Sequence, residues 1–178
     1  MLCNQSIINS TETFANRRMN SFKNKKLKIL RFSFYIILLD QISKVLIMNF
    51  LNFERSIVII PNFLSFTLVK NKGAAFSLFS NSTTLLTIIS ILASFLLTTY
   101  ILTSPTKSLV NSIGLSFLLG GTIGNGLDRL FKGYVIDFLE LAPINFPIFN
   151  LADISINIAI ILFIIDLFKS KEKPRLKN

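Results

Sequence analysis

The chain has 178 residues, about one domain, and 51% of them are hydrophobic. It carries 19 Lys and Arg against nine Asp and Glu, a net charge of +10, with no His and a single Cys. The composition therefore excludes catalytic centres and zinc sites that need His, as well as intrachain disulfides and thiolate metal cages.

The charges are concentrated at the two ends of the chain. Residues 1–28 are polar and basic without an apolar stretch of signal-peptide length, and residues 169–178 form a second basic tail. Two uncharged runs, 73–106 and 108–127, are each long enough to cross a bilayer. This distribution indicates a membrane protein with no nucleic-acid partner. We expect residues 1–28 to be a flexible cytoplasmic extension attracted to anionic lipid head groups.

Four apolar segments predict transmembrane helices within a membrane domain at 29–168. Their approximate bounds are 32–51, 83–102, 109–127 and 151–168. An even number of spans places both termini on the same side of the membrane. Lys and Arg are most frequent at both ends and in the 103–108 turn, so the positive-inside rule makes that side cytoplasmic.

The first outer loop, residues 52–82, has the character of a hairpin. A β-branched run at 56–60 is followed by Pro61-Asn62 and a second strand-prone run at 63–69. We expect a small hairpin on the outer leaflet. Asn71 and Gly73 come directly after it, where they suit either a turn or a functional role.

Four aspartates lie inside or at the edge of hydrophobic sequence, where an ionisable group is costly and a functional candidate. Asp40 and Lys44 are four residues apart and share a helix face, so they are able to pair. Asp128 precedes Arg129, and an acid beside a guanidinium tends to stay ionised as an anchor. These two aspartates are therefore weaker candidates for proton transfer.

The other two, Asp137 and Asp153, are each a lone carboxylate among apolar neighbours. The predicted topology places both near the outer interface. Two carboxylates close together in a site of low dielectric constant share a proton, which allows one to act as base and the other as acid. Because four aspartates allow six pairs, spacing alone leaves the choice of pair open.

Glycines cluster in the third predicted span, and Gly120-x-x-x-Gly124 is typical of closely packed helices. The same bare surface would also let a substrate backbone or a lipid chain approach the aspartates. The glycine pattern is compatible with both helix packing and substrate approach.

Five short boxes, in order, resemble those of lipoprotein signal peptidase (signal peptidase II), over about residues 32–168. They are Asp40-Gln-Ile-Ser-Lys44, Asn71-Lys-Gly-Ala-Ala75, Gly120-Gly-Thr-Ile-Gly-Asn-Gly-Leu-Asp-Arg129, Val135-Ile-Asp-Phe138 and Phe146-Pro-Ile-Phe-Asn-Leu-Ala-Asp153. The resemblance implies an all-α membrane protein with four transmembrane helices and a small extracytoplasmic β-cradle. It also implies an amphipathic periplasmic helix, for which 74–81 is the available segment.

The resemblance further implies an intramembrane aspartic endopeptidase of the bacterial inner membrane that needs no metal or organic cofactor. Its substrate would be a diacylglyceryl-modified prolipoprotein, cut on the amino side of the lipobox Cys, and its other partners membrane lipids; we expect a monomer. Asp137 and Asp153 match the catalytic pair. Residues that match substrate-binding or pair-holding positions are Asn71, Gly73, Asn125, Arg129 and Asn150, and those at supporting polar positions are Asp40, Lys44 and Asp128.

Two other classes of function were weighed. A Ser-Lys peptidase using Ser43 and Lys44 is disfavoured, since adjacent helix positions point about 100° apart and Lys44 has Asp40 as a partner. A small transporter or proton channel with an aspartate relay fits the composition equally well. The outward position of the aspartate pair and the asymmetric boxes favour the peptidase, because transporters favour midplane sites and internal repeats.

Overall fold

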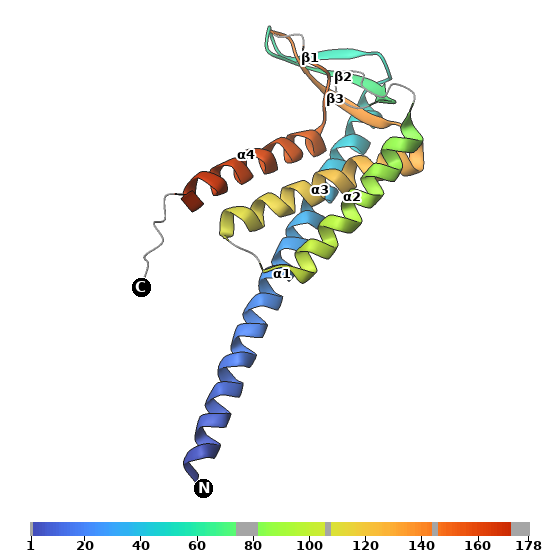
Figure 1. Cartoon of the computed structure of the whole chain (residues 1–178). Helices are drawn as coiled ribbons and strands as arrows, with labels where there is room; N and C mark the ends of the chain where they lie inside the picture. The colour runs from blue at the N-terminus through green and yellow to red at the C-terminus, as the bar shows by residue number, and fades with distance from the viewer. Residues whose placement is uncertain (1, 74–81, 106–107, 144–145, 172–178) are drawn as a thin grey trace.

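The computed structural model describes residues 2–73, 82–105, 108–143 and 146–171, with side chains from residue 19 to residue 169 within those ranges. The elements are α1 (Leu2–Phe50), β1 (Ser56–Ile60), β2 (Leu64–Asn71), α2 (Thr83–Thr103), α3 (Leu109–Lys132), β3 (Val135–Leu141) and α4 (Leu151–Lys171). The sheet lies at one end of the helices, and the N-terminal part of α1 and the last turns of α4 lie away from it (Figure 1). The segment 74–81, where we predicted an amphipathic helix, lies outside the described residues.

The first helix is longer than predicted. Residues 2–28, expected to be flexible, are helical and continue without a break into the apolar part of α1. No Gly or Pro occurs in the first 50 residues, so nothing in the sequence interrupts the helix. This basic part of α1 projects beyond the ends of the other helices (Figure 1).

The described helices differ in how apolar they are. Among the residues that the structure describes, only α2 and the Leu151–Lys169 part of α4 are long and apolar enough to cross a membrane by length and composition. Both carry large exposed apolar side chains, among them Leu92, Phe95 and Ile161. The structure is thus mostly helical with a small sheet. Two of the four predicted spans have the length and composition of a membrane span.

The sheet has the strand order β1-β2-β3, with antiparallel neighbours. The first two strands form the predicted hairpin, whereas β3 was not predicted. Val69 pairs with Asp137 and Asn71 with Val135. A buried cluster of Ile47, Leu51, Leu68, Ile136 and Phe138 packs the sheet against the end of α1. This cluster holds β3 against the helices.

The central helix is α3, which packs against α1, α2 and α4. A Cβ atom on Gly124 would lie 2.7 Å from Asp40 Oδ2, and one on Gly121 would lie 2.5 Å from the Ala152 carbonyl oxygen. These positions allow α1 and α4 to approach the backbone of α3 closely. The glycine face is therefore occupied by neighbouring helices, which favours the packing interpretation over substrate approach at these positions.

The ends of α3 are set by local sequence. Ser108 caps its first turn, where Ser108 Oγ accepts a hydrogen bond from the Asn111 N–H at 2.9 Å. Gly133 closes its last turn with φ of 76°, in the left-handed region that glycine adopts without strain. The chain then enters β3 two residues later, which places Asp137 directly beyond the end of α3.

Candidate active site

Asp137 and Asn150 are brought together by a short pairing between β3 and the segment that precedes α4. The Leu139 N–H donates to the Phe149 carbonyl at 2.8 Å, and the Phe149 N–H donates back at 3.0 Å. Asn150 follows immediately, and its Nδ2 donates to Asp137 Oδ1 at 2.6 Å. The backbone pairing thus places one amide side chain against one carboxylate.

Asn150 also caps the first turn of α4. The Asp153 N–H donates to Asn150 Oδ1 at 2.9 Å, and the Asn150 N–H donates to Asp153 Oδ2 at 3.1 Å. This reciprocal arrangement has the form of a capping box, with Asn and Asp as the two side chains. Through its side chain and its backbone, Asn150 therefore holds both Asp137 and Asp153 at one site.

The remaining carboxylate oxygens accept hydrogen bonds from two further amides. Asn71 Nδ2 donates to Asp137 Oδ2 at 2.8 Å, and Asn125 Nδ2 donates to Asp153 Oδ1 at 2.7 Å. All four oxygens of the pair thus face neutral N–H donors. In the part of the chain that the structure describes, neither carboxylate forms an ion pair.

The environment of Asp137 favours its protonated form. Burial, followed by the negative charge of Asp153, raises the pKa of Asp137 from 3.8 to about 6, while hydrogen bonds from Asn71 and Asn150 act in the opposite direction. A carboxyl with such a pKa exchanges its proton near neutral pH. Two carboxylates held together in this way have the chemistry of an acid–base pair.

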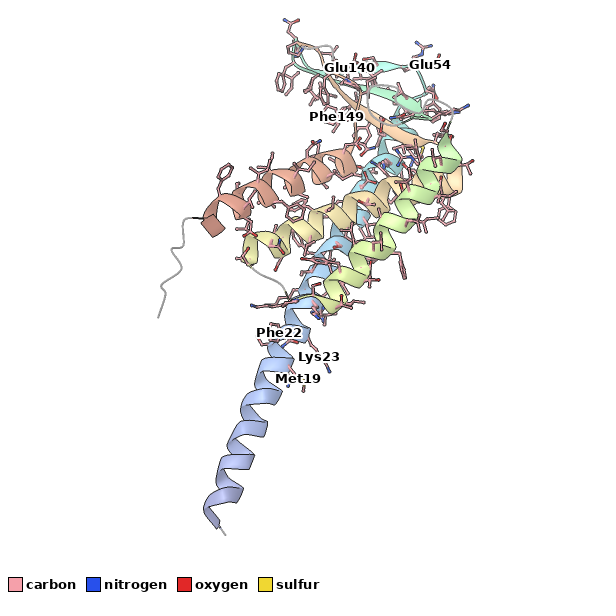
Figure 2. The ribbon with its side chains drawn as sticks, viewed as in Figure 1. Met19, Phe22, Lys23, Glu54, Glu140 and Phe149 are labelled. Carbon is pink, nitrogen blue, oxygen red and sulfur yellow. The ribbon has the colours of Figure 1, made fainter. Side chains whose placement is uncertain are left out.

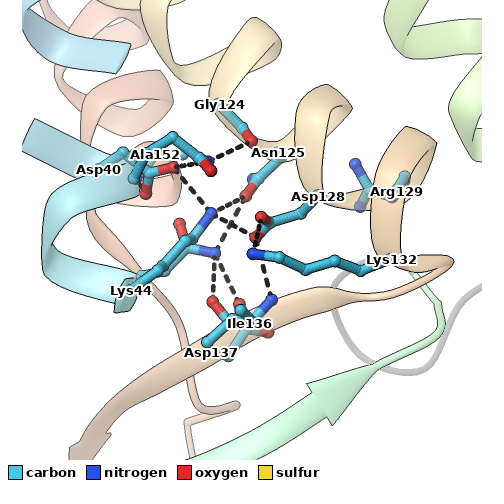
Figure 3. Close-up of polar contacts among 12 residues, drawn as sticks. Asp40, Lys44, Gly124, Asn125, Asp128, Arg129, Lys132, Ile136, Asp137 and Ala152 are labelled. Atoms are coloured by element: carbon cyan, nitrogen blue, oxygen red, sulfur yellow. Dashed lines mark hydrogen bonds and ion pairs between the residues drawn. The ribbon is translucent and has the colours of Figure 1, made fainter. Parts of the chain in front are cut away.

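Behind the pair lies a buried layer of alternating charges (Figure 3). Lys44 Nζ lies 2.8 Å from Asp40 Oδ2 and 2.9 Å from Asp128 Oδ2, and all three side chains are fully buried. Lys132 adds a second ammonium group, 2.8 Å from Asp128 Oδ1. Two carboxylates are therefore matched by two ammonium groups, which is what burial of charge requires.

Each aspartate of this layer also fixes the backbone beside one member of the Asp137/Asp153 pair. Asp128 Oδ2 accepts the N–H of Ile136, the residue before Asp137, at 3.2 Å. Asp40 Oδ1 accepts the N–H of Ala152, the residue before Asp153, at 3.0 Å. The charged layer therefore positions both carboxylates through the main chain.

Lys44 orients a side chain of the site as well. Its Nζ donates to Asn125 Oδ1 at 3.2 Å, and Asn150 Nδ2 donates to the same oxygen at 3.0 Å. Because Oδ1 receives both donors, the Nδ2 group of Asn125 faces Asp153. This hydrogen-bond network assigns the orientation of the Asn125 amide.

The pair opens into a cleft of about 810 Å³. Its polar lining includes Asn71, Gly73 and Arg129, and its apolar lining includes residues 146–149 and the isoleucines of α4. Arg129 lies within 3.5 Å of the Gly73 carbonyl and of Ser90 Oγ, while its buried Nε has no partner among the described atoms. The cleft thus combines an acid–base pair and a cation with a long apolar wall.

The structure brings together every site residue predicted from the sequence. Those that line the cleft are Asn71, Gly73, Asn125, Arg129, Asp137 and Asp153, while Asn150, Asp40, Lys44 and Asp128 lie buried against them. Two residues were missed: Lys132, and Gln41, whose Nε2 donates to Asp40 Oδ2 and to the Gly124 carbonyl at 3.1 Å each. Lys132 follows Asp128 by four residues, the spacing that identified Asp40 and Lys44. Within the described residues, no group of three acidic or sulfur side chains converges as a metal site.

Comparisons with known proteins match most of the chain. The family model described as Signal peptidase (SPase) II matches residues 32–169. A lipoprotein signal peptidase of Parasynechococcus marenigrum is 43% identical over 140 residues, covering 79% of this chain and 88% of that protein. One from Microcystis aeruginosa is 40% identical over 138 residues, covering 77% of this chain and 89% of that protein.

Two solved structures, each described as a bacterial membrane enzyme, have the same fold. The first has a TM-score of 0.78 and 31% identity, covering 85% of this chain and 93% of the other. The second has a TM-score of 0.72 and 33% identity, covering 80% and 93%. The structural similarity therefore extends over most of the chain.

Proposed function

Because this chain belongs to the signal peptidase II family and is a membrane peptidase that cleaves signal peptides from lipoproteins, we propose that it works as an aspartic endopeptidase with Asp137 and Asp153 as its catalytic pair. The observation that carries this proposal is the convergence of two carboxylates on neutral amides at the floor of a cleft. A transporter or proton channel is not favoured by the family match.

In the proposed reaction the pair holds one proton. The ionised carboxylate takes a proton from a water molecule while the water oxygen bonds to the scissile carbonyl carbon. At the same time the protonated carboxyl gives its proton to the carbonyl oxygen. The C–N bond then breaks as the leaving nitrogen receives a proton from one carboxyl, while the other carboxylate takes a proton from a hydroxyl of the intermediate as the carbonyl re-forms, so the pair again holds one proton. Because the two groups are coupled, the proton belongs to Asp137 and Asp153 together.

The surrounding residues keep this pair in place during the reaction. Asn150 bridges the two carboxylates, and Asn125 and Asn71 each donate to one of them. Lys44 fixes the orientation of Asn125. The network holds the oxygens without placing a cation in contact with them, so the proton remains free to transfer.

The substrate would be a prolipoprotein whose lipobox Cys carries a diacylglyceryl group, cut on the amino side of that Cys. The apolar wall formed by residues 146–149 and by Ile154, Ile158 and Ile161 suits a signal helix and acyl chains. Arg129 and Asn71 lie where they would orient the polar peptide groups. We propose that the chain acts as a monomer surrounded by membrane lipids.

We further propose that residues 29–168 form a four-span domain of the bacterial inner membrane. α2 and α4 supply apolar spans, while α1 and α3 bury their charges against each other. The basic part of α1 and the basic tail after α4 would face the cytoplasm. The sheet and the Asp137/Asp153 pair would then lie near the outer leaflet, at the opposite end of the helices (Figure 1).

The test is cleavage of a synthetic lipobox peptide by the purified full chain, with and without a diacylglyceryl group on the Cys. The proposal predicts cleavage of the modified peptide directly before the Cys, little cleavage of the unmodified peptide, and none of either by Asp153→Asn. Asp166→Asn, the same change at an aspartate of α4 that does not line the cleft, is the matched control and should remain active. Full activity of Asp153→Asn would refute the catalytic assignment.

A further inference from the structure

A second cleft lies between α1 and α3, on a part of the molecule that the active site does not use. It has a volume of about 440 Å³, and none of its lining residues is shared with the active-site cleft. Its lining from α1 consists of Lys25, Lys28, Ile29 and Phe32, and its lining from Ser108 and α3 consists of Ser108, Leu109, Ser112, Ile113 and Ser116.

The lining residues recur at helical spacing on both walls. On α1 they occupy positions i, i+3, i+4 and i+7 from Lys25, and on α3 they occupy the same positions from Leu109. Such positions form one continuous face of a helix. On α1 this face is cationic over its first turn and apolar over the next, so the cleft is graded from polar to apolar along its length.

The serines make the α3 wall small without making it polar. Ser112 Oγ donates to the Ser108 carbonyl at 2.8 Å, and Ser116 Oγ donates to the Ser112 carbonyl at 3.0 Å. Because both hydroxyl hydrogens bond within the helix, neither donor is left facing the cleft unsatisfied. The short side chains leave room for a hydrocarbon chain beside Ile29 and Ile113.

The cations at the mouth have no counter-ion among the side chains that the structure describes. Lys25 and Lys28 are exposed, and neither forms an ion pair with a carboxylate within the described ranges. One acid is present at this rim: Asp166 of α4 accepts a hydrogen bond from Ser108 Oγ at 2.5 Å. Lys26, between the two, points elsewhere and donates to the Leu102 carbonyl at the end of α2.

We propose that this cleft binds one anionic glycerophospholipid of the cytoplasmic leaflet. Its phosphate would lie between Lys25 and Lys28, and an acyl chain would follow Ile29, Phe32 and Ile113. The proposal rests on the membrane orientation proposed above, which places the basic part of α1 on the cytoplasmic side, where anionic lipids attract it. Charge complementarity favours an anionic lipid over a zwitterionic one, and the apolar wall favours a lipid over a soluble anion.

The lysines of this cleft lie before the part of the chain that the family model matches. The signal peptidase II match begins at residue 32, so Lys25, Lys28 and Ile29 precede the matched region. The bound lipid would fix the basic part of α1 to the start of α3. The segment 25–32 would thus connect the projecting part of α1 to the peptidase domain through a bound lipid.

The test is native mass spectrometry of the full chain in neutral detergent, titrated with phosphatidylglycerol or phosphatidylcholine of matched chains. We expect one phosphatidylglycerol to be retained in preference to phosphatidylcholine. Lys25→Gln/Lys28→Gln should weaken its binding about 25-fold, since each cation near the lipid surface is worth about fivefold. The matched control is Lys23→Gln/Arg31→Gln, which removes two cations from the same stretch of α1 outside the cleft; Lys23 is labelled in Figure 2.

A second variant tests the shape of the cleft without changing its charge. Ser112→Leu fills the space beside Ile113 and should also lower phosphatidylglycerol retention. Equal retention of the two lipids, unchanged binding by the Lys25/Lys28 variant, or an equal loss in the control variant would overturn the proposal. Peptide cleavage measured on the same samples keeps this outcome separate from that of the proposed catalytic function.

Discussion

Two pairs of aspartates lie within one site, and their charges are balanced in different ways. Asp40 and Asp128 share the ammonium group of Lys44 at 2.8 and 2.9 Å, whereas Asp137 and Asp153 receive hydrogen bonds from neutral amides. The first pair is locked by counter-ions and holds the backbone. The second pair has no counter-ion among the described residues, so it is free to exchange a proton.

Within this one buried region, one pair of aspartates holds the backbone in place and the other pair is available for proton transfer. Asp128 and Asp40 accept hydrogen bonds from the N–H groups of Ile136 and Ala152. Asp137 and Asp153 directly follow these two residues in the chain. The cost of burying Asp40, Lys44 and Asp128 is thus offset by mutual pairing, and their placement serves Asp137 and Asp153. Substitutions in the first pair should therefore lower stability, whereas substitutions in the second should lower activity.

The largest expected difference is between Asp137→Asn and Asp128→Asn. Asp137→Asn should lower kcat by about 10³-fold or more with little change in thermal stability, because it removes a proton-transfer group but keeps the side-chain shape. Asp128→Asn should lower the melting temperature clearly, because it deprives Lys44 and Lys132 of a shared carboxylate. The measurements are peptide cleavage and thermal unfolding in detergent. A stable, inactive Asp128→Asn beside an active Asp137→Asn would reverse the assignment.

Lys44→Met should cost about 3–5 kcal/mol of unfolding free energy, because it leaves two buried carboxylates without their shared cation. Lys132→Met provides the matched control: its side chain is 28% exposed and contacts only one of the two aspartates. Its cost should be about 1 kcal/mol. Chemical unfolding in mixed micelles measures both. Equal costs for the two variants would show that the charged layer does not depend on Lys44.

Gly124→Ala should cost about 1–3 kcal/mol, since its Cβ would lie 2.7 Å from Asp40 Oδ2 and would displace a carboxylate that Lys44 and the Ala152 N–H hold in place. Gly126→Ala, two residues away on the same helix, would meet Ser90 Cβ at 3.2 Å, a contact that a small shift relieves. Its cost should be smaller. The same unfolding measurement compares the two, and a Gly124→Ala variant as stable as the parent chain would contradict close packing at this point.

The smallest effect is expected from Asn71→Ala. Asn71 donates to the ionised form of Asp137 and lowers its pKa, so removing the amide should raise that pKa further above about 6. If the active form of the pair carries one proton, kcat/KM falls as the pH rises through this pKa. The alkaline limb of the profile should therefore move to higher pH, by about one unit. Asn157→Ala, which does not contact Asp137, should leave the limb unmoved; a downward shift in Asn71→Ala would contradict the sign.

Much of this arrangement was predictable from local sequence. Apolar runs identified the four helical segments to within a few residues at most ends, and the β-branched run at 56–60 identified the hairpin. The apolar setting of Asp137 and Asp153 made them candidates, and the family resemblance selected them. Local signals suffice where a helix or hairpin depends on neighbouring residues.

What the sequence did not predict depends on distant partners. β3 exists because it pairs with β2 and with Phe149, and Val135–Leu141 follows α3 with only Gly133 as a boundary signal. The bridging role of Asn150 needs β3 and the first turn of α4 to meet, which no spacing rule describes. The helical state of residues 2–28 was missed because a polar, basic composition was given more weight than the absence of Gly and Pro.

The most direct test of the account is to compare the two single variants with the double variant of the catalytic pair. Two groups that act as one unit lose almost everything at the first substitution. We therefore predict that Asp137→Asn, Asp153→Asn and the double variant have the same low residual cleavage of the diacylglyceryl-modified peptide. Substantial activity in either single variant, or a double variant whose loss is the product of two partial losses, would contradict the account.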